Sequence, residues 1–491
     1  MKKNKILINC ILTGAVVLAS ATSCKKSYLD INQNPNFPSD VTIVELLPSA
    51  EAAIAHAVGN NLQIYGGIWG QYWTQSPSSS QYKTIEQYSP SASDFDRPWK
   101  ALYADALQDL KNIIAKATAE SKPNYVACAK ILQAYSFQLL TDNFGDIPFF
   151  EAIRADELIL SPHYDSQQDV YNGIIKLLSE ADALIDESSS AFNPGTEDLL
   201  LGGNMALWKE FGNTLKLRVY LRLAYKDPGK AQAGIAALAT AGALFLNPGE
   251  DVKINYTLNG GNTNPLFSSI IGLGGTQNLV ASGTAVNYLL NNGDTRVDAF
   301  YTPASNGNQI GIAQGNYTLP AGTKVSIPGP KTGGDGGDDS SALAPVRLMS
   351  GYESEFLQAE AVVRGWLTGD AKALYETGIT ASFASFGATD TFTLGIINDS
   401  ASAFPTSGTS EDKIKAIITQ KWIALCGNEG TEGWTEWRRT GYPNFFTEST
   451  NSIIGAGRLP ARFFYPNTEV TRNGNFPGQK LIYDKVWWDV N

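Results

Sequence analysis

Apolar residues recur every three or four positions along much of the chain, which is the spacing of a buried α-helical face. In residues 125–141 this stripe consists of Cys128, Leu132, Tyr135 and Leu139. The same spacing predicts further helices over residues 44–58, 97–117, 166–186, 204–226, 229–241, 351–366, 370–385 and 411–426. Aromatic and small residues recur on these faces, so we expect the helices to pack closely in pairs. The pattern predicts a mainly α fold, although no repeat of about 34 residues can be recognised.

Two long regions depart from the helical pattern. Residues 245–345 are rich in Gly, Asn, Thr and Pro, and residues 441–491 are irregular as well. The first region also contains tyrosines, which favour folded loops with short strands over disorder: Tyr256, Tyr288, Tyr301 and Tyr317. We expect a single domain over 44–491. It comprises a helical scaffold at about 44–244 and 346–440, a loop-rich insert at about 245–345 and an irregular C-terminal segment.

The start of the chain has the layout of a bacterial lipoprotein signal. Three lysines precede an apolar run over residues 6–18, and small residues then lead to Cys24. The run is shorter than the ~20 residues that a membrane-spanning helix needs. We expect a signal peptide over 1–23, acylation of Cys24, and a lipid anchor and polar tether over 24–43. Ordinary cleavage near Ala21 is the alternative.

The net charge of the chain limits the classes of molecule that we expect it to bind. Residues 1–23 hold three of the 37 Lys and Arg residues and none of the 48 Asp and Glu residues, so residues 24–491 carry a formal net charge of −14. Such an acidic chain argues against nucleic acid or an anionic membrane surface as the partner.

Residues suited to metal or nucleophile chemistry are scarce. The chain has two histidines, and no Cys/His spacing typical of a zinc site occurs. Cys128 and Cys426 each fall within an apolar helical pattern, which favours buried thiols over a long-range disulfide. Asp335, Asp338 and Asp339 could hold calcium, but their spacing is not that of an EF-hand and favours a solvated turn. We expect no cofactor.

Several motifs follow one another along nearly the whole chain: 24–32 (CKKSYLDIN), 143–149 (NFGDIPF), 164–167 (YDSQ), 198–224, 347–366, 420–425 (QKWIAL), 436–443 (EWRRTGYP), 459–462 (LPAR) and 487–489 (WWD). Together they resemble the SusD/RagB family of outer-membrane lipoproteins, and within it the SusD-like second subfamily. A single motif of this kind would be weak, whereas the whole series in the same order is specific.

The resemblance implies a fold, a location and a partner. It implies a helical superhelix of tetratricopeptide-like helix pairs, with an irregular lobe that helps to build the ligand site. It implies a protein lipid-anchored to the outer membrane and facing the cell exterior. Such a protein delivers an oligosaccharide, or sometimes a peptide, to a SusC-like TonB-dependent barrel. The resemblance implies no catalysis.

An enzyme is the alternative that the residues themselves suggest. Glu432 and Glu436 stand four positions apart on a predicted helix beside Trp437, a spacing that a glycosidase carboxylate pair could use. Ion pairs with Arg438 and Arg439 and a packed aromatic cap explain the same residues structurally, and we favour that interpretation. A glycoside hydrolase and a peptide-binding importer component stay as alternatives to a glycan-binding protein.

Residues 62–88 are the part of the chain densest in rings and amides. Sugars present apolar C–H faces that suit aromatic rings and hydroxyls that suit amides or carboxylates. We therefore expect ligand contacts from this stretch and from the insert, with Trp73 and Tyr82 first: Trp73, Tyr82, Gln71, Trp69, Tyr72, Asn262 and Tyr317. The alternative is that Trp69 and Trp73, about one helical turn apart, belong to the core.

Overall fold

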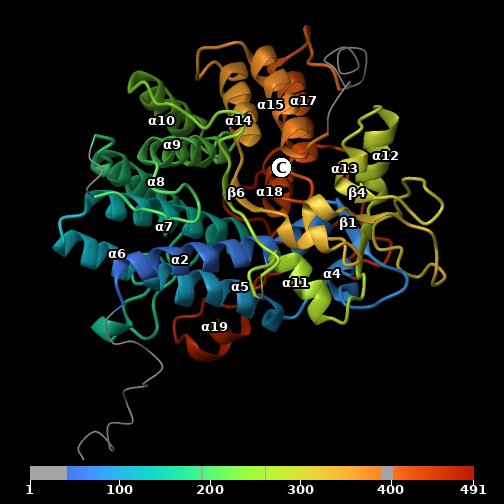
Figure 1. Cartoon of the computed structure of the whole chain (residues 1–491), viewed down its shortest axis with the longest axis horizontal. Helices are drawn as coiled ribbons and strands as arrows, with labels where there is room; N and C mark the ends of the chain where they lie inside the picture. Colours follow the sequence, from blue (N-terminus) through green and yellow to red (C-terminus); the bar gives the residue numbers. More distant parts are fainter. Residues whose placement is uncertain (1–40, 189–191, 260, 389–401) are drawn as a thin grey trace, which may run out of the picture. The chain divides into compact units, whose positions relative to one another are not determined.

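The computed structural model describes residues 41–188, 192–259, 261–388 and 402–491. Residues 43–491 form one compact unit in which helices predominate, so the predicted mainly α fold is confirmed (Figure 1). The predicted signal peptide, Cys24 and the tether up to residue 40 lie outside the described residues.

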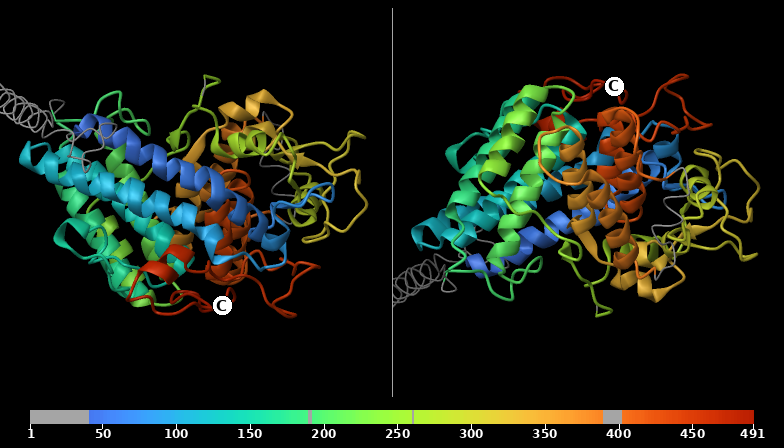
Figure 2. Two further views of the ribbon diagram at one scale, coloured as in Figure 1. Left: turned by 90° about the horizontal axis from the view of Figure 1, so that it is seen from below. Right: turned by 90° about the horizontal axis from the view of Figure 1, so that it is seen from above.

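The first part of the unit is a series of helices in which each packs against its neighbour in the chain. Their bounds are α2 Ile43–Ala57, α3 Gln63–Trp69, α5 Asp96–Lys100, α6 Gln108–Ala119, α7 Pro123–Phe144, α8 Gln167–Leu184, α9 Met205–Arg222 and α10 Pro228–Thr240. A π-helical turn over Val58–Leu62 joins α2 to α3, and another over Ala101–Leu107 joins α5 to α6. Contacts run from α6 to α7, α7 to α8, α8 to α9 and α9 to α10 (Figures 1 and 2). These paired helices match the predicted scaffold.

A second group of helices follows the insert: α14 Gly351–Val363, α15 Ala371–Ser385, α17 Ser410–Ala424 and α18 Gly430–Thr440. Side-chain oxygens of Ser350, Asp370 and Thr409 accept backbone N–H groups at three of their N-termini, which stabilises each helix start. Their apolar faces meet in a core that includes Phe356 and Tyr375. Burial of such faces is what the periodic sequence pattern predicted.

The insert consists of loops, short strands and short helices. Strand β1 (Trp73–Gln75) pairs antiparallel with β3 (Leu279–Ala281), β2 (Val252–Ile254) with β6 (Val346–Met349), and β4 (Tyr301–Thr302) with β5 (Ile327–Pro328). The helices are α11 Pro265–Gly272, α12 Gly283–Asn291 and α13 Val297–Phe300. Folded loops with short strands are therefore confirmed. These helices were missed because segments of four to nine residues show too little periodicity to recognise.

Strand pairing fastens the insert to both helical groups. Strand β1 follows α3 and pairs with the insert strand β3, placing Trp73 opposite Ala281. Strand β6 leads into α14 and pairs with β2 near the start of the insert. Figure 1 shows β4 next to β1, with α12 and α13 above them and the short helix α4 (Lys83–Glu86) below. Segments more than 200 residues apart in sequence thus build one surface.

Two smaller expectations concern the core and the membrane. Cys128 and Cys426 are both buried free thiols, as predicted. Within the described ranges, no helix has the length and apolarity that crossing a membrane would require.

Candidate ligand-binding site

Trp69, Tyr72 and Trp73 belong to the core of the molecule. They are 4%, 0% and 0% exposed, respectively. Trp69 Nε1 donates to the carbonyl of Ile85 at 3.1 Å, and Tyr72 stacks on Trp422 with ring centroids 5.3 Å apart. These rings have no free face for a sugar, so the expectation that they stack on ligand is corrected for this conformation. The sequence could not decide this, because rings in a core and rings in a cleft follow the same spacing.

The Gln71 side chain connects its own segment to the C-terminal segment and to the insert through hydrogen bonds. Its side-chain amide donates to the carbonyl of Thr447 at 2.6 Å and accepts from the Thr447 N–H at 3.1 Å. A residue of an adjacent β-strand would make the same pair of hydrogen bonds. Its Oε1 also accepts from the Thr284 hydroxyl at 2.7 Å. Gln71 is 1% exposed, so its hydrogen-bonding groups fasten the C-terminal segment and the insert instead of contacting a ligand.

Tyr82 lies at the wall of a polar pocket of about 350 Å³. The pocket is hydroxyl- and charge-rich, and its hydrogen-bonding residues are Asn61, Gln81, Thr84, Ser93, Asp94 and Arg97. Tyr65 and Tyr82, which are both largely buried, also line the pocket. Burial raises the pKa of Tyr82 to about 12, so its hydroxyl remains neutral at physiological pH. Amide, carboxylate and guanidinium groups beside tyrosine rings are the chemistry that a sugar requires.

Local hydrogen bonds hold the Tyr82 loop in place. Gln75 of β1 donates to the carbonyl of Ser76 and to the hydroxyl of Ser79, and its Oε1 accepts from the Tyr82 N–H. Asn278 of the insert accepts from the Gln81 N–H at 3.2 Å. The pocket wall is therefore supported from both β1 and the insert.

Tyr317 lies on the other side of α4 from this pocket, at a rim where three distant segments meet. Gln87, at the end of α4, donates to the Tyr317 hydroxyl at 2.9 Å, and Lys83 Nζ lies 5.3 Å from its ring centroid. Asn451 donates to the carbonyl of Gly315 at 2.7 Å. Tyr317 is 7% exposed, so a ligand would meet the edge of this ring and the polar groups around it.

Asn262 does not join this surface through any contact that we observe. It is exposed in the loop after β2, and its backbone bonds are to Thr257 and Asn259 of the same loop. Of the predicted ligand residues, Tyr82 and Tyr317 therefore lie on opposite sides of α4. Residues that the sequence interpretation missed at this site, such as Asn61, Asp94 and Arg97, come from helical segments with no distinctive motif.

Glu86 lies beneath the same rim as a fully buried carboxyl group. Its Oε1 accepts from the Gln75 N–H at 3.0 Å, whereas Oε2 has no hydrogen-bond partner. Burial raises the pKa of Glu86 to about 7, against smaller opposing effects of hydrogen bonds from Thr74, Gln75 and Gly315. The junction between β1, α4 and the insert therefore contains a carboxyl group that titrates near neutral pH.

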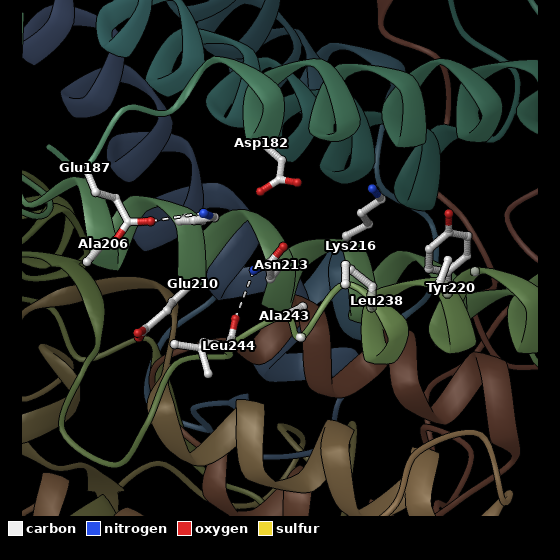
Figure 3. Close-up of a pocket in the computed structure, with 15 residues that line it drawn as sticks. Asp182, Glu187, Ala206, Glu210, Asn213, Lys216, Tyr220, Leu238, Ala243 and Leu244 are labelled. Carbon is white, nitrogen blue, oxygen red and sulfur yellow. Dashed lines mark hydrogen bonds and ion pairs between the residues drawn. The ribbon is translucent and has the colours of Figure 1, made fainter.

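A separate hollow of about 360 Å³ lies between α8, α9 and the residues after α10 (Figure 3). Lys209 pairs with Glu187 at 3.0 Å, and Asn213 donates to the carbonyl of Leu244 at 3.1 Å. Figure 3 shows Asp182 and Lys216 facing the hollow from opposite helices, with Tyr220 as its one ring. This hollow offers little stacking surface, so the Tyr82 pocket is the better candidate for a sugar.

Comparison with protein families shows which family this chain belongs to. A SusD-like family model, described as "Starch-binding associating with outer membrane", matches residues 35–466. The chain belongs to this SusD-like family. No curated protein matches the sequence significantly.

Solved structures agree with this SusD-like fold. A chitin-binding SusD homologue from Flavobacterium johnsoniae matches with a TM-score of 0.76 and 23% identity, covering 91% of this chain and 99% of its own. A SusD homologue from Bacteroides uniformis matches with a TM-score of 0.76 and 23% identity, covering 92% and 100%. A further chitin-binding protein has a TM-score of 0.75 and 24% identity, covering 92% and 100%. At these identities the likeness concerns the fold.

SusD-like proteins bind ligands and are not enzymes, and the arrangement of Glu432 and Glu436 agrees with this. Arg222 of α9 contacts Glu436 at 2.5 Å and Glu432 at 2.6 Å, and Arg439 pairs with Glu436 and Glu360. Although burial would raise it, the neighbouring Arg439, Lys421 and Arg222 hold the pKa of Glu436 well below its usual value. A glycosidase acid needs a raised pKa, so this pair is structural.

The aspartates of the 335–339 run stabilise turns in this SusD-like chain. Asp335 accepts from the Gly337 N–H at 2.9 Å and from the Thr302 hydroxyl at 2.7 Å, and Asp338 accepts from the Ser340 N–H. Throughout the described part of the chain, no three His, Cys, Asp or Glu side chains are placed to hold a metal ion. The turn, which the spacing favoured over calcium, accounts for these contacts.

Proposed function

We propose that this protein binds an oligosaccharide at the surface formed by the Tyr82 pocket and the Tyr317 rim. The observation that carries the proposal is the Tyr82 pocket itself, where two tyrosines lie beside amide, hydroxyl, carboxylate and guanidinium groups. Membership of a family described as starch-binding supports a glycan as the ligand class. The chitin-binding titles of two structural neighbours support the same class.

We further propose that the protein is lipid-anchored at Cys24, faces the cell exterior and passes its ligand to a SusC-like TonB-dependent barrel. The support is the signal-like N-terminus with its cysteine, together with the outer-membrane association in the family description. Binding without turnover suits such delivery, because the ligand must leave unchanged.

Calorimetry with neutral oligosaccharides, followed by product analysis, tests the binding step. Maltoheptaose and chitohexaose represent the two ligand types named among the relatives, and a mixed oligopeptide library represents the peptide alternative. We expect saturable binding of an oligosaccharide with no new product. Released shorter sugars would contradict a binding role, and retention of peptides alone would contradict the glycan proposal.

A further inference from the structure

A second, larger pocket lies away from Tyr82, at the end of α18. It measures about 540 Å³, within the range of ~300–1,000 Å³ typical of small-ligand sites. Its walls come from the C-terminal part of α18, the loops around residues 444–446 and 457–459, and the tail 483–491. It shares no lining residue with the Tyr82 pocket.

Aromatic rings form one side of this pocket. Trp437 and Phe446 stack on each other with centroids 5.3 Å apart and planes 16° from parallel, and both are half-buried. The half-buried Tyr483 stands in the same wall, with the Arg458 guanidinium 4.3 Å from its ring centroid. Partly exposed, mutually braced rings provide a rigid apolar platform of the kind on which a pyranose ring packs.

Positive charge surrounds this platform. Arg438 lies buried at the pocket and donates to the carbonyls of Asp142 and Ala461, while its Nε has no acceptor. Asp142 and Asp489 are the carboxylates that act on Arg438, and Arg458 donates to the carbonyl of Ile454 at 3.0 Å. Lys485 is exposed, and Asp489 is the one acidic residue in the lining, 4.0 Å from Lys485 Nζ.

This charge balance is unusual for the molecule. The chain as a whole carries a formal charge of −11, yet three basic residues face one acidic residue here. Burial lowers the pKa of Arg438 to about 10, against the opposing effects of Asp142 and Asp489, so its guanidinium is still charged at neutral pH. These two carboxylates offset the burial of the guanidinium only in part, so a further anion bound nearby would be stabilised.

We propose that this pocket binds a uronic-acid unit of an acidic glycan. The sugar ring packs on the Trp437–Phe446 platform, and its carboxylate is directed toward Lys485 and Arg458. Asn444, exposed at the pocket edge, supplies an amide for the ring hydroxyls. The inference rests on the proposed glycan-binding function but assigns a separate site and a charged sugar class to it.

Trigalacturonate and its fully methyl-esterified form provide a matched pair of probes, because esterification converts each carboxylate to a neutral methyl ester and leaves the sugar rings and their hydroxyls unchanged. In calorimetry on the full mature protein, we expect trigalacturonate to bind at least about fivefold more tightly than the ester. Raising salt from about 50 to about 500 mM should reduce this difference, since the exposed cations are screened. Equal affinity of the two probes, or no binding of trigalacturonate, would overturn the proposal.

Two variants locate the binding event. Trp437→Ala should weaken trigalacturonate binding about tenfold through loss of ring packing, and Lys485→Gln should weaken it by about two- to fivefold. Lys176→Gln, which changes a 77% exposed lysine on α8, is the matched control and should bind as the parent does. If Trp437→Ala does not fold, Lys485→Gln decides the outcome.

Two further outcomes distinguish the proposed uronic-acid site at Trp437 from the proposed oligosaccharide site at Tyr82. Loss of trigalacturonate binding in Tyr82→Ala, with Trp437→Ala and Lys485→Gln unaffected, would overturn the second site while leaving a glycan-binding role at Tyr82. Binding of trigalacturonate through Trp437, with no neutral oligosaccharide bound, would contradict the Tyr82 proposal and support the second site.

Discussion

At the scale of single residues, Trp73 and Tyr82 have separable roles. Trp73 is fully buried, and a side-chain Cβ at Gly67 would lie 2.4 Å from its ring, so α3 and Trp73 are closely packed. We expect Trp73→Ala to lower the free energy of unfolding by about 3–5 kcal/mol. Tyr82→Ala should lower it less and weaken oligosaccharide binding by about 1–3 kcal/mol. Urea unfolding and calorimetry on both variants measure the contrast, and parental stability of Trp73→Ala would contradict its core role.

Glu86 predicts a pH dependence of stability. Burial raises its pKa to about 7 in the folded protein from the ordinary value of 4.5, so unfolding releases its proton between these pH values. Stability contributed by the protonated group is present below pH 4.5 and is lost as pH rises to about 7, by about 1.4 kcal/mol per pH unit. Between pH 5 and pH 8, the melting temperature of Glu86→Gln should rise relative to that of the parent protein, as measured by thermal unfolding. The exposed Glu120→Gln is the control, and a pH-independent difference for Glu86→Gln would refute the prediction.

At the scale of elements, Arg222 joins α9 to α18. It reaches Glu432 and Glu436 of α18, and Lys421 of α17 also approaches both carboxylates. Removing one partner from a buried ion network leaves the opposite charges uncompensated, which costs about 3–5 kcal/mol. We therefore expect Arg222→Ala to unfold at clearly lower urea, whereas exposed Arg472→Ala on α19 (Asn467–Arg472) should not. Unchanged unfolding of Arg222→Ala would show that the network contributes little.

At the scale of the whole molecule, Cys24 predicts that the protein is anchored to a membrane. Replacing Cys24 by Ala should leave a folded protein that moves from the membrane pellet to the soluble fraction. A single acyl chain binds membranes only weakly, so the expected anchor carries more than one chain. Fractionation with immunodetection measures the shift, and Lys25→Ala is the neighbouring control. A Cys24→Ala protein that still pellets with outer membranes would contradict the anchor.

The proposed barrel partner is also tested on the whole molecule. Extraction of membranes in mild detergent, followed by affinity purification of this protein, should recover a large β-barrel protein in a stable ratio. Mass spectrometry identifies the partner, and a parallel purification of an unrelated outer-membrane lipoprotein controls for carry-over. Recovery of this protein alone in several detergents, with the barrel present in the membrane, would contradict the proposal.

Long periodic segments explain why the helical scaffold could be predicted from the sequence. The stripe Cys128, Leu132, Tyr135 and Leu139 marks α7, although in the structure α7 is buried on almost every side. The short helices α11 and α12 were not predicted, since eight or nine residues inside a loop-rich region show no clear period. The predicted short strands of the insert were right.

The sequence by itself determined the helical elements, the family and the aromatic richness of residues 62–88, because these depend on local spacing and on ordered motifs. Only the tertiary structure decided which rings are accessible. Trp69 is buried because Trp434 of α18 and Phe463 pack against it, and Tyr72 is buried because it stacks on Trp422 of α17, whereas Tyr82 lies at a pocket wall. The exposure of a ring depends on contacts between segments hundreds of residues apart, such as the contact of Tyr72 with Trp422. The local spacing of apolar residues carries no information about such contacts.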